Sequence, residues 1–317
     1  MGTHVAGDAP DMDRLVDETV AGVGADIEAL RMPGLWGVVL GGGYARGEGG
    51  VLESSDGARR LYNDLDFYVV ATPGASSGDI SAVADALAPV SERWTARVGI
   101  SVDFCAPKTP WRIRHDQDRL MIQELLNGYV DVAGEKGAVM FSGVERRPPS
   151  AFPWQEAARM MVNRGAGLLL AMGGDDAVFT ARNINKCVLG AGDARLIAAG
   201  EYRWKAVERA ETLADELYKK AVEWKFRPRA EAPCGWERAR EVWLKAADEV
   251  MSAGRRSGVL RRSLYQTARW IARRRTLGDL RTLGLWPTAR MLIAMERLVR
   301  ERRAMPPAFR RDWEIFN

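Results

Sequence analysis

Thiol and imidazole side chains are scarce in this sequence of 317 residues. It contains 3 cysteines, Cys105, Cys187 and Cys234, which lie far apart and form no Cys-x-x-Cys pair. This spacing argues against a zinc site or a disulfide framework and favours a reducing compartment. The 2 histidines are His4, in an N-terminal stretch that we expect to be loose, and His115, which we expect on the surface or at a helix start. Serine–histidine catalysis and histidine-based metal sites are therefore disfavoured.

Long apolar runs are missing as well. No segment approaches the ~20 consecutive apolar residues that a membrane-spanning helix needs. The first residues show no basic-then-apolar signal peptide, and Ala6 occupies the position where an N-myristoylation motif requires Ser or Thr. We therefore expect a cytoplasmic protein with no membrane partner.

Two carboxylates stand at the start of an apolar, β-branched run. Asp64 and Asp66 are two residues apart, and in a strand this spacing points both side chains to the same face. Neighbouring carboxylates repel each other unless a cation lies between them. Because Mg²⁺ is usually held by one or two carboxylates plus substrate phosphates, the pattern indicates Mg²⁺ and a nucleotide.

A third acid follows in the stretch 97–105, which we expect to form another strand. Asp103 is flanked there by Val102 and Phe104, and an acid in so apolar a run needs a partner if it is buried. If this strand lies beside the first, three carboxylates could hold two ions about 3.5–4 Å apart, a clamp suited to phosphoryl or nucleotidyl displacement.

A glycine turn precedes the three acids. It reads Gly41-Gly42-Gly43-Tyr44-Ala45-Arg46-Gly47-Glu48 and follows an apolar strand-like stretch. The order of strand, glycine turn, helix, Asp-x-Asp strand and later aspartate resembles the DNA polymerase β-type nucleotidyltransferase superfamily. The chain is most similar to its small-molecule and minimal members over residues 35–135, where 120–134 resemble the closing helix and strand. It departs from them at 49–60, which we expect to be an inserted polar loop.

The resemblance implies a fold and an activity. The fold is α+β, with an N-terminal mixed β-sheet domain over 1–147 followed by an all-helical domain over 148–317. The activity is Mg²⁺-dependent transfer of a nucleoside monophosphate from an NTP to an acceptor hydroxyl, with release of pyrophosphate. The implied site residues are Asp64, Asp66 and Asp103 for catalysis and two Mg²⁺ ions, and Gly42, Gly43, Arg46 and Lys186 for the nucleotide.

Each of these features also has an ordinary interpretation. A glycine run is most often a plain turn, and an Asp-x-Asp pair is most often solvated. Arg46 could be a surface charge and Glu48 an acid in the first turn of a helix. Lys186 could be a surface lysine, and Gly190 and Gly192 would let its helix approach another backbone closely. For Asp193 a capping or structural role is favoured over orienting an acceptor.

Hydrophobic periodicity divides the chain into expected elements. It predicts a helix over 12–31, strands over 35–41, 64–71 and 97–105, a helix over 78–88, and a strand–helix region ending near 141. A Pro-rich stretch at 146–153 predicts the domain boundary. The helices expected after it are 154–172, 179–199, 202–224, 235–253, 259–276 and 287–304.

Charge is unevenly distributed. Residues 251–317 carry 16 Lys and Arg against 5 Asp and Glu, a net of +11, whereas the rest of the chain carries a net of −7. The basic part includes Arg255-Arg256, Arg261-Arg262 and Arg273-Arg274-Arg275, with Trp270 and Trp286 interleaved. Two alternative functions follow: an RNA or tRNA-end nucleotidyltransferase using this tract, or a non-catalytic nucleotide-binding interaction module. The acidic part suits a cationic acceptor, either a small molecule or a protein.

Overall fold

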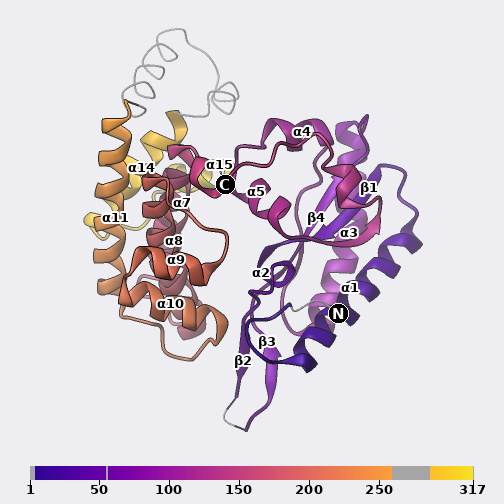
Figure 1. The fold of residues 1–317 in the computed structure, drawn as a ribbon, viewed down its shortest axis with the longest axis horizontal. Helices are drawn as coiled ribbons and strands as arrows, with labels where there is room; N and C mark the ends of the chain where they lie inside the picture. The colour runs from indigo at the N-terminus through magenta and orange to yellow at the C-terminus, as the bar shows by residue number, and fades with distance from the viewer. Residues whose placement is uncertain (1–3, 55, 259–285, 317) are drawn as a thin grey trace. The chain divides into compact units, whose positions relative to one another are not determined.

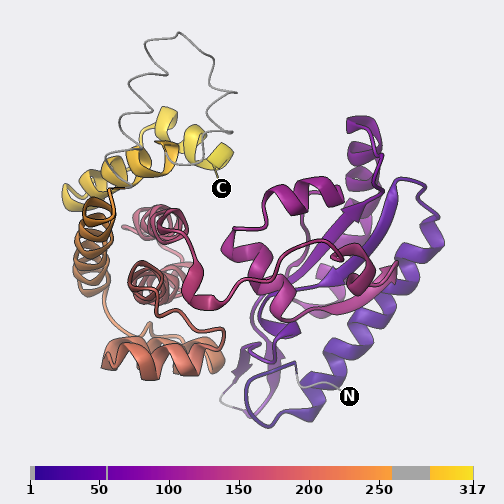
Figure 2. The same cartoon turned by 45° about the horizontal axis from the view of Figure 1, so that its top comes forward.

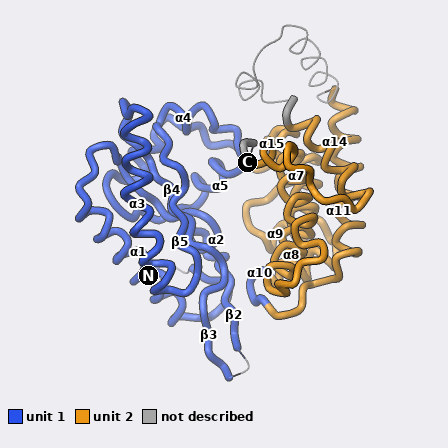
Figure 3. The backbone as a smooth tube through the Cα atoms, turned by 180° about the vertical axis from the view of Figure 1, so that it is seen from behind, with its two compact units in different colours: residues 1–147, 225–228 blue, residues 148–224, 229–317 orange. Residues whose placement is uncertain are grey.

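The computed structural model describes residues 4–54, 56–258 and 286–316. They form an α+β structure with a small mixed sheet near the N-terminus and a mostly helical C-terminal region, as predicted (Figures 1 and 2). The expected helix over 259–276 and the clusters around Trp270 lie outside the described residues. The chain divides into two compact units: Met1–Arg147 with Lys225–Pro228, and Pro148–Trp224 with the residues from Arg229 onward (Figure 3).

The sheet of the first unit has the strand order β5-β4-β1-β6. Its strands are β1 (Leu35–Leu40), β4 (Leu65–Ala71), β5 (Val102–Phe104) and β6 (Val130–Gly134). The central strand β1 is antiparallel to both neighbours, whereas β4 and β5 are parallel. The strands predicted over 35–41 and 64–71 are confirmed. Near-continuous apolar runs with β-branched residues are typical of strands with both faces covered.

The strand predicted over 97–105 is wrong at its beginning. Helix α3 (Ser77–Val98) extends to Val98, and Gly99, in the left-handed conformation with φ 74°, ends it before β5. The helix predicted to stop at residue 88 continues past Pro89 because buried side chains recur at helical spacing. These buried residues are Val83, Leu87, Val90 and Trp94.

Helices cover both faces of the sheet. On one face α1 (Pro10–Leu30) and α3 pack on strand residues that include Leu65 and Phe67. On the other face lie α4 (Pro110–His115), α5 (Leu120–Asn127) and α6 (Gly137–Met140), with Val39 and Val70 in a second core (Figure 1). Along β4, Tyr68 and Val70 therefore point toward the face that α5 covers, opposite to Leu65 and Phe67.

Two expectations for the first unit are corrected. The segment expected to be an inserted polar loop contains an antiparallel hairpin, β2 (Val51–Glu53) with β3 (Arg59–Leu61). The N-terminus expected to be loose is ordered at His4, which is 4% exposed. The His4 ring nitrogens lie 3.0 Å from the Tyr44 carbonyl oxygen and 2.9 Å from an Asp17 carboxylate oxygen, contacts far apart in sequence.

The second unit is helical throughout its described residues. Its elements are a 3₁₀ turn, Pro149–Ala151, and helices α7 (Trp154–Leu170), α8 (Ala177–Ala199), α9 (Ala206–Leu213), α10 (Glu216–Phe226), α11 (Trp236–Arg256), α14 (Trp286–Arg300) and α15 (Pro307–Phe316). The last two residues of α10 belong to the first unit. The single helix expected over 202–224 is interrupted because Ala214 is left-handed and the Asp215 carboxylate accepts hydrogen bonds from the next amides. In the part of the chain that is described, no helix combines the length and apolarity that crossing a membrane requires.

Candidate functional site

The three predicted acidic residues lie at one end of the β4–β5 pair. Asp66 on β4 and Asp103 on β5 are direct register partners, and Asp64 immediately precedes β4. Since Leu65 and Phe67 point into the first core, alternation directs Asp64 and Asp66 to the other face. Asp66 is partly buried and Asp103 is exposed, with the Ser101 hydroxyl donating to Asp103 at 2.6 Å. The structure thus brings Asp66 and Asp103 together on neighbouring strands.

The carboxylates of Asp66 and Asp103 suit a hard cation whose remaining coordination positions are filled by a bound ligand or water. Within the described ranges no group of three or more His, Cys, Asp or Glu side chains is close enough to form a metal cluster. An in-register pair of carboxylates on one face suits Mg²⁺, which takes only one or two protein carboxylates and keeps water or phosphate oxygens for the rest. Simultaneous binding by all three aspartates stays a prediction.

The glycine turn lies against Asp66. The Gly41 amide donates to the Asp66 carbonyl at 2.8 Å, and the single-turn helix α2 (Gly42–Ala45) follows. Gly42 has φ 70°, and a Cβ atom built there would lie 2.6 Å from Asp66 Oδ2. Both the backbone conformation and the space therefore require glycine at this position. Two predicted parts of the site, the glycines and an acidic residue, are adjacent in the structure.

Arg46 and Glu48 are held by partners rather than exposed. The Arg46 guanidinium lies 3.8 Å from the Glu124 carboxylate of α5, and only 15% of the Arg46 side chain is exposed. Glu48 follows α2 instead of occupying a first helical turn, and its carboxylate accepts a hydrogen bond of 2.7 Å from Lys225. The surface-charge interpretation of Arg46 and the helix-dipole interpretation of Glu48 are wrong.

Tyr44 is a structural residue of the site that the sequence did not indicate. Its ring is buried, and its hydroxyl donates to the Gly50 carbonyl at 3.0 Å. The same hydroxyl accepts from the amides of Tyr62 and Asn63 at 3.0 and 3.2 Å. One side chain of the glycine turn thereby fixes the backbone immediately before Asp64. An aromatic residue inside a glycine turn is the only local signal of this role.

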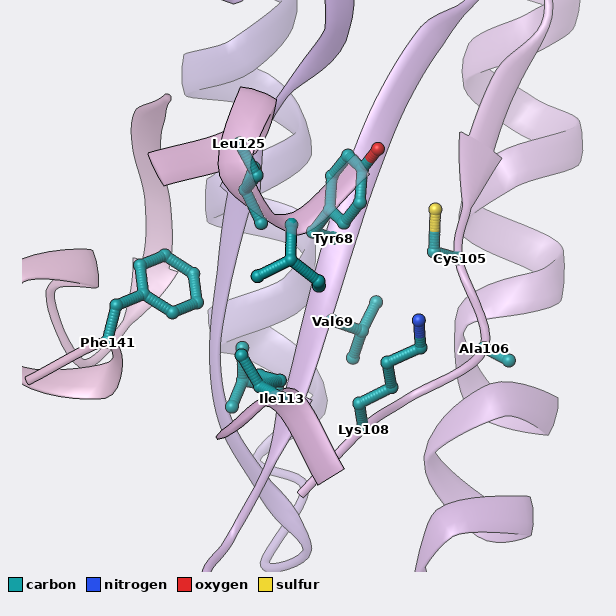
Figure 4. Close-up of a pocket in the computed structure, with 10 residues that line it drawn as sticks. Tyr68, Val69, Cys105, Ala106, Lys108, Ile113, Leu125 and Phe141 are labelled. Carbon is teal, nitrogen blue, oxygen red and sulfur yellow. The ribbon is translucent and has the colours of Figure 1, made fainter. Parts of the chain in front are cut away.

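The next positions along β4 and β5 line a small pocket next to the acids. Tyr68, Cys105 and Lys108 are among its lining residues, and in Figure 4 their polar tips point toward the same side. Its space of about 10 Å³ holds no more than one water. Burial raises the pKa of the Tyr68 hydroxyl and, with Asp66 adding to the effect, raises the pKa of the Cys105 thiol to about 11. Both groups are therefore protonated at neutral pH.

Lys186 and Asp193 lie on α8, in the second unit. Lys186 is partly buried, and its proposed contact with a triphosphate stays a prediction. Asp193 is structural, as favoured, but it is not a helix cap: its carboxylate pairs with Arg209 at 2.8 Å and accepts from the Tyr218 hydroxyl at 2.5 Å. Gly192 admits the Tyr218 ring, since a Cβ there would lie 2.2 Å from it. The expected approach of another backbone at this glycine is wrong, because the nearest atoms there belong to the Tyr218 and Leu213 side chains.

Comparison with known proteins adds no family to this geometry. A search of protein-family models finds no match to the chain, and a search of curated proteins finds none either. The resemblance to polymerase β-type nucleotidyltransferases therefore depends on the residues and their arrangement alone.

Proposed function

We propose that the chain is a Mg²⁺-dependent nucleotidyltransferase that transfers a nucleoside monophosphate from an NTP to an acceptor hydroxyl. One observation carries the proposal: Asp66 and Asp103 are register partners on parallel strands, with Gly42 directly against the Asp66 carboxylate. Neighbouring carboxylates beside the backbone amides of a glycine turn can combine a cation site with an anion site. A nucleoside triphosphate with its metal ion presents both of those charges.

The glycine turn binds the nucleotide in this proposal. The backbone amides of Gly42 and Gly43 donate to phosphate oxygens, and Arg46 adds positive charge there. For Lys186, in the second unit, a phosphate contact stays a prediction from the sequence. Arg46 is pre-positioned because its stem packs against Gly128, where a Cβ would lie 2.7 Å from Arg46 Cγ. Fixing the triphosphate in this way aligns the α-phosphorus with the acceptor, which is the main source of rate enhancement in such reactions.

The carboxylates serve the displacement itself. Asp64, Asp66 and Asp103 would hold the Mg²⁺ ions, which supply neutralisation of phosphate charge and stabilisation of the leaving pyrophosphate when bound. The acceptor oxygen forms a bond to the α-phosphorus while the bond from that phosphorus to the pyrophosphate oxygen breaks. Asp103, exposed on its strand, accepts the proton of the acceptor hydroxyl.

The acceptor class follows from charge. The net of −7 over residues 1–250 favours a cationic hydroxyl compound or a basic protein segment over a polyanion, since an acidic surface concentrates cations. The alternative acceptor, an RNA end bound by residues 251–317, depends on 16 basic residues, of which the cluster Arg273-Arg274-Arg275 lies outside the described residues.

Titration of each NTP into the protein, with and without Mg²⁺, tests the proposal. We expect saturable binding of at least one NTP that requires Mg²⁺ and is weakened at least tenfold by Asp66→Asn. The matched control is Asp85→Asn, because Asp85 is an exposed aspartate on α3 and its loss should leave binding unchanged. Equal NTP binding by wild type and Asp66→Asn would contradict the assignment.

A further inference from the structure

Glu48 is a buried acid at the end of the glycine turn. Its side chain is 8% exposed, and its amide donates to the Gly43 carbonyl at 2.8 Å. The Glu48 backbone therefore closes the turn that begins at the nucleotide-binding glycines, while its carboxylate lies out of water. A carboxylate in such a place stays ionised only if a cation accompanies it.

The cation is Lys225, which comes from a distant part of the chain. Its ammonium lies 2.7 Å from Glu48 Oε2, and 20% of its side chain is exposed. Lys225 begins the short segment Lys225–Pro228, which belongs to the first unit although the residues on both sides of it belong to the second. A four-residue strap is thus part of the unit that carries the candidate site.

The strap also contacts the backbone around the turn. A Cβ built at Gly50 would lie 2.5 Å from the Lys225 carbonyl oxygen and 2.7 Å from Asn63 Oδ1. The Gly50 amide donates to that Asn63 oxygen at 2.7 Å, and Asn63 directly precedes Asp64. Lys225 is therefore adjacent, through Glu48 and Gly50, to both ends of the candidate site: the glycines and the first aspartate.

We propose that Lys225 is a positioning residue for nucleotide binding, acting through Glu48 to hold the glycine turn beside Asp66. This inference rests on the proposed function and adds a residue that lies outside the segment resembling nucleotidyltransferases. Lys225 does not touch the substrate in this account. It holds the Glu48 carboxylate in place, so that the Gly42 and Gly43 amides stay directed at the phosphates.

Loss of the ion pair between Lys225 and Glu48 should weaken binding of the Mg²⁺–NTP complex. Replacing Lys225 by Met keeps most of the apolar stem but removes the charge that pairs with Glu48, so a protonated Glu48 or one displaced toward water becomes more favourable. Either change releases the Glu48 end of the turn. We expect the dissociation constant for the Mg²⁺–NTP complex to rise at least tenfold, because ordering the turn then has to accompany binding.

Hydrogen exchange and nucleotide titration together test this inference. In the nucleotide-free protein, Lys225→Met should speed amide exchange at residues 41–50 at least tenfold while exchange in β4 stays as in wild type. Lys225→Arg should keep slow exchange and wild-type NTP affinity. The charge-exchanged protein, Glu48→Lys with Lys225→Glu, should recover part of the affinity lost by either single change, which a merely local packing effect would not produce.

Lys219→Met is the matched control. Lys219 lies on the same helix, α10, but pairs on the surface with Glu216, so its loss should change neither exchange at 41–50 nor affinity. Failure of the wild-type protein to bind any NTP would overturn the proposed function. Wild-type binding that Lys225→Met leaves unchanged, with unchanged exchange at 41–50, would overturn the positioning role alone.

Discussion

Substitution of Gly42 by Ala acts on the candidate site through two separable effects. The first is backbone strain, because φ at Gly42 is 70°, a conformation that costs an L-residue roughly 1–2 kcal/mol. The second is steric: the added Cβ would lie 2.6 Å from Asp66 Oδ2, closer than such atoms approach, so the carboxylate has to move. The strain lowers the stability of the fold, and the displacement damages the metal–nucleotide site.

A second glycine separates these effects. Gly57, in the hairpin turn, has φ 82°, and a Cβ built there meets nothing within 4 Å. Gly57→Ala should therefore lose about 1 kcal/mol of unfolding free energy through strain alone. Gly42→Ala should lose at least as much. Urea denaturation followed by circular dichroism measures both values.

Nucleotide binding should distinguish the two variants. Displacement of Asp66 that weakens its interaction by about 1.4–2.8 kcal/mol raises the dissociation constant of Mg²⁺–NTP about 10- to 100-fold. We expect this loss in Gly42→Ala and wild-type affinity in Gly57→Ala, both measured by calorimetric titration on folded protein. Wild-type affinity in Gly42→Ala would refute the reasoning, since the turn would then not need to lie against Asp66.

Three further predictions concern stability and thiol chemistry. Tyr44→Phe should cost about 1–3 kcal/mol in urea denaturation, because the buried hydroxyl makes three hydrogen bonds around the site; an unchanged midpoint would contradict that role. Arg209→Met should cost about 3 kcal/mol by removing the buried cation that pairs with Asp193, whereas Arg238→Met, at an exposed ion pair, should cost less than about 1 kcal/mol. Cys105, with its pKa raised to about 11, should be about one-thousandth thiolate at pH 8 and should therefore react slowly with iodoacetamide. The alkylation rate should rise about tenfold per pH unit up to about pH 11. Rapid alkylation at pH 8 would contradict this pKa.

Local pattern was sufficient for the parts of the site that lie within single strands and turns. The spacing of Asp64 and Asp66 predicts their common face, and the apolar stretch around Asp103 predicts a strand, though one that begins later than expected. The predicted strand begins too early because α3 continues to Val98 instead of ending near residue 88. A proline such as Pro89 usually signals a helix end, but the buried face of α3 outweighs the lost hydrogen bond.

The rest of the site depends on contacts between distant residues. Tyr44 reaches Asn63 only because β2 and β3 fold into a hairpin, and Glu48 meets Lys225 across 177 positions of sequence. His4, expected in a loose terminus, is buried against Tyr44 and Asp17. Periodicity and turn chemistry report on neighbours within a few residues, so a single sequence contains no pattern from which such pairs follow.

Binding of Mn²⁺ as a substitute for Mg²⁺ tests the central claim most directly, that Asp64, Asp66 and Asp103 form a metal–nucleotide site. Loss of the free Mn²⁺ electron paramagnetic resonance signal counts bound ions in the presence of a saturating non-hydrolysable NTP. The account predicts two protein-dependent Mn²⁺ ions per chain for wild type, one for Asp103→Asn, and none for the double variant Asp64→Asn with Asp66→Asn. Mn²⁺ binding that is the same in wild type and all of these variants would contradict it.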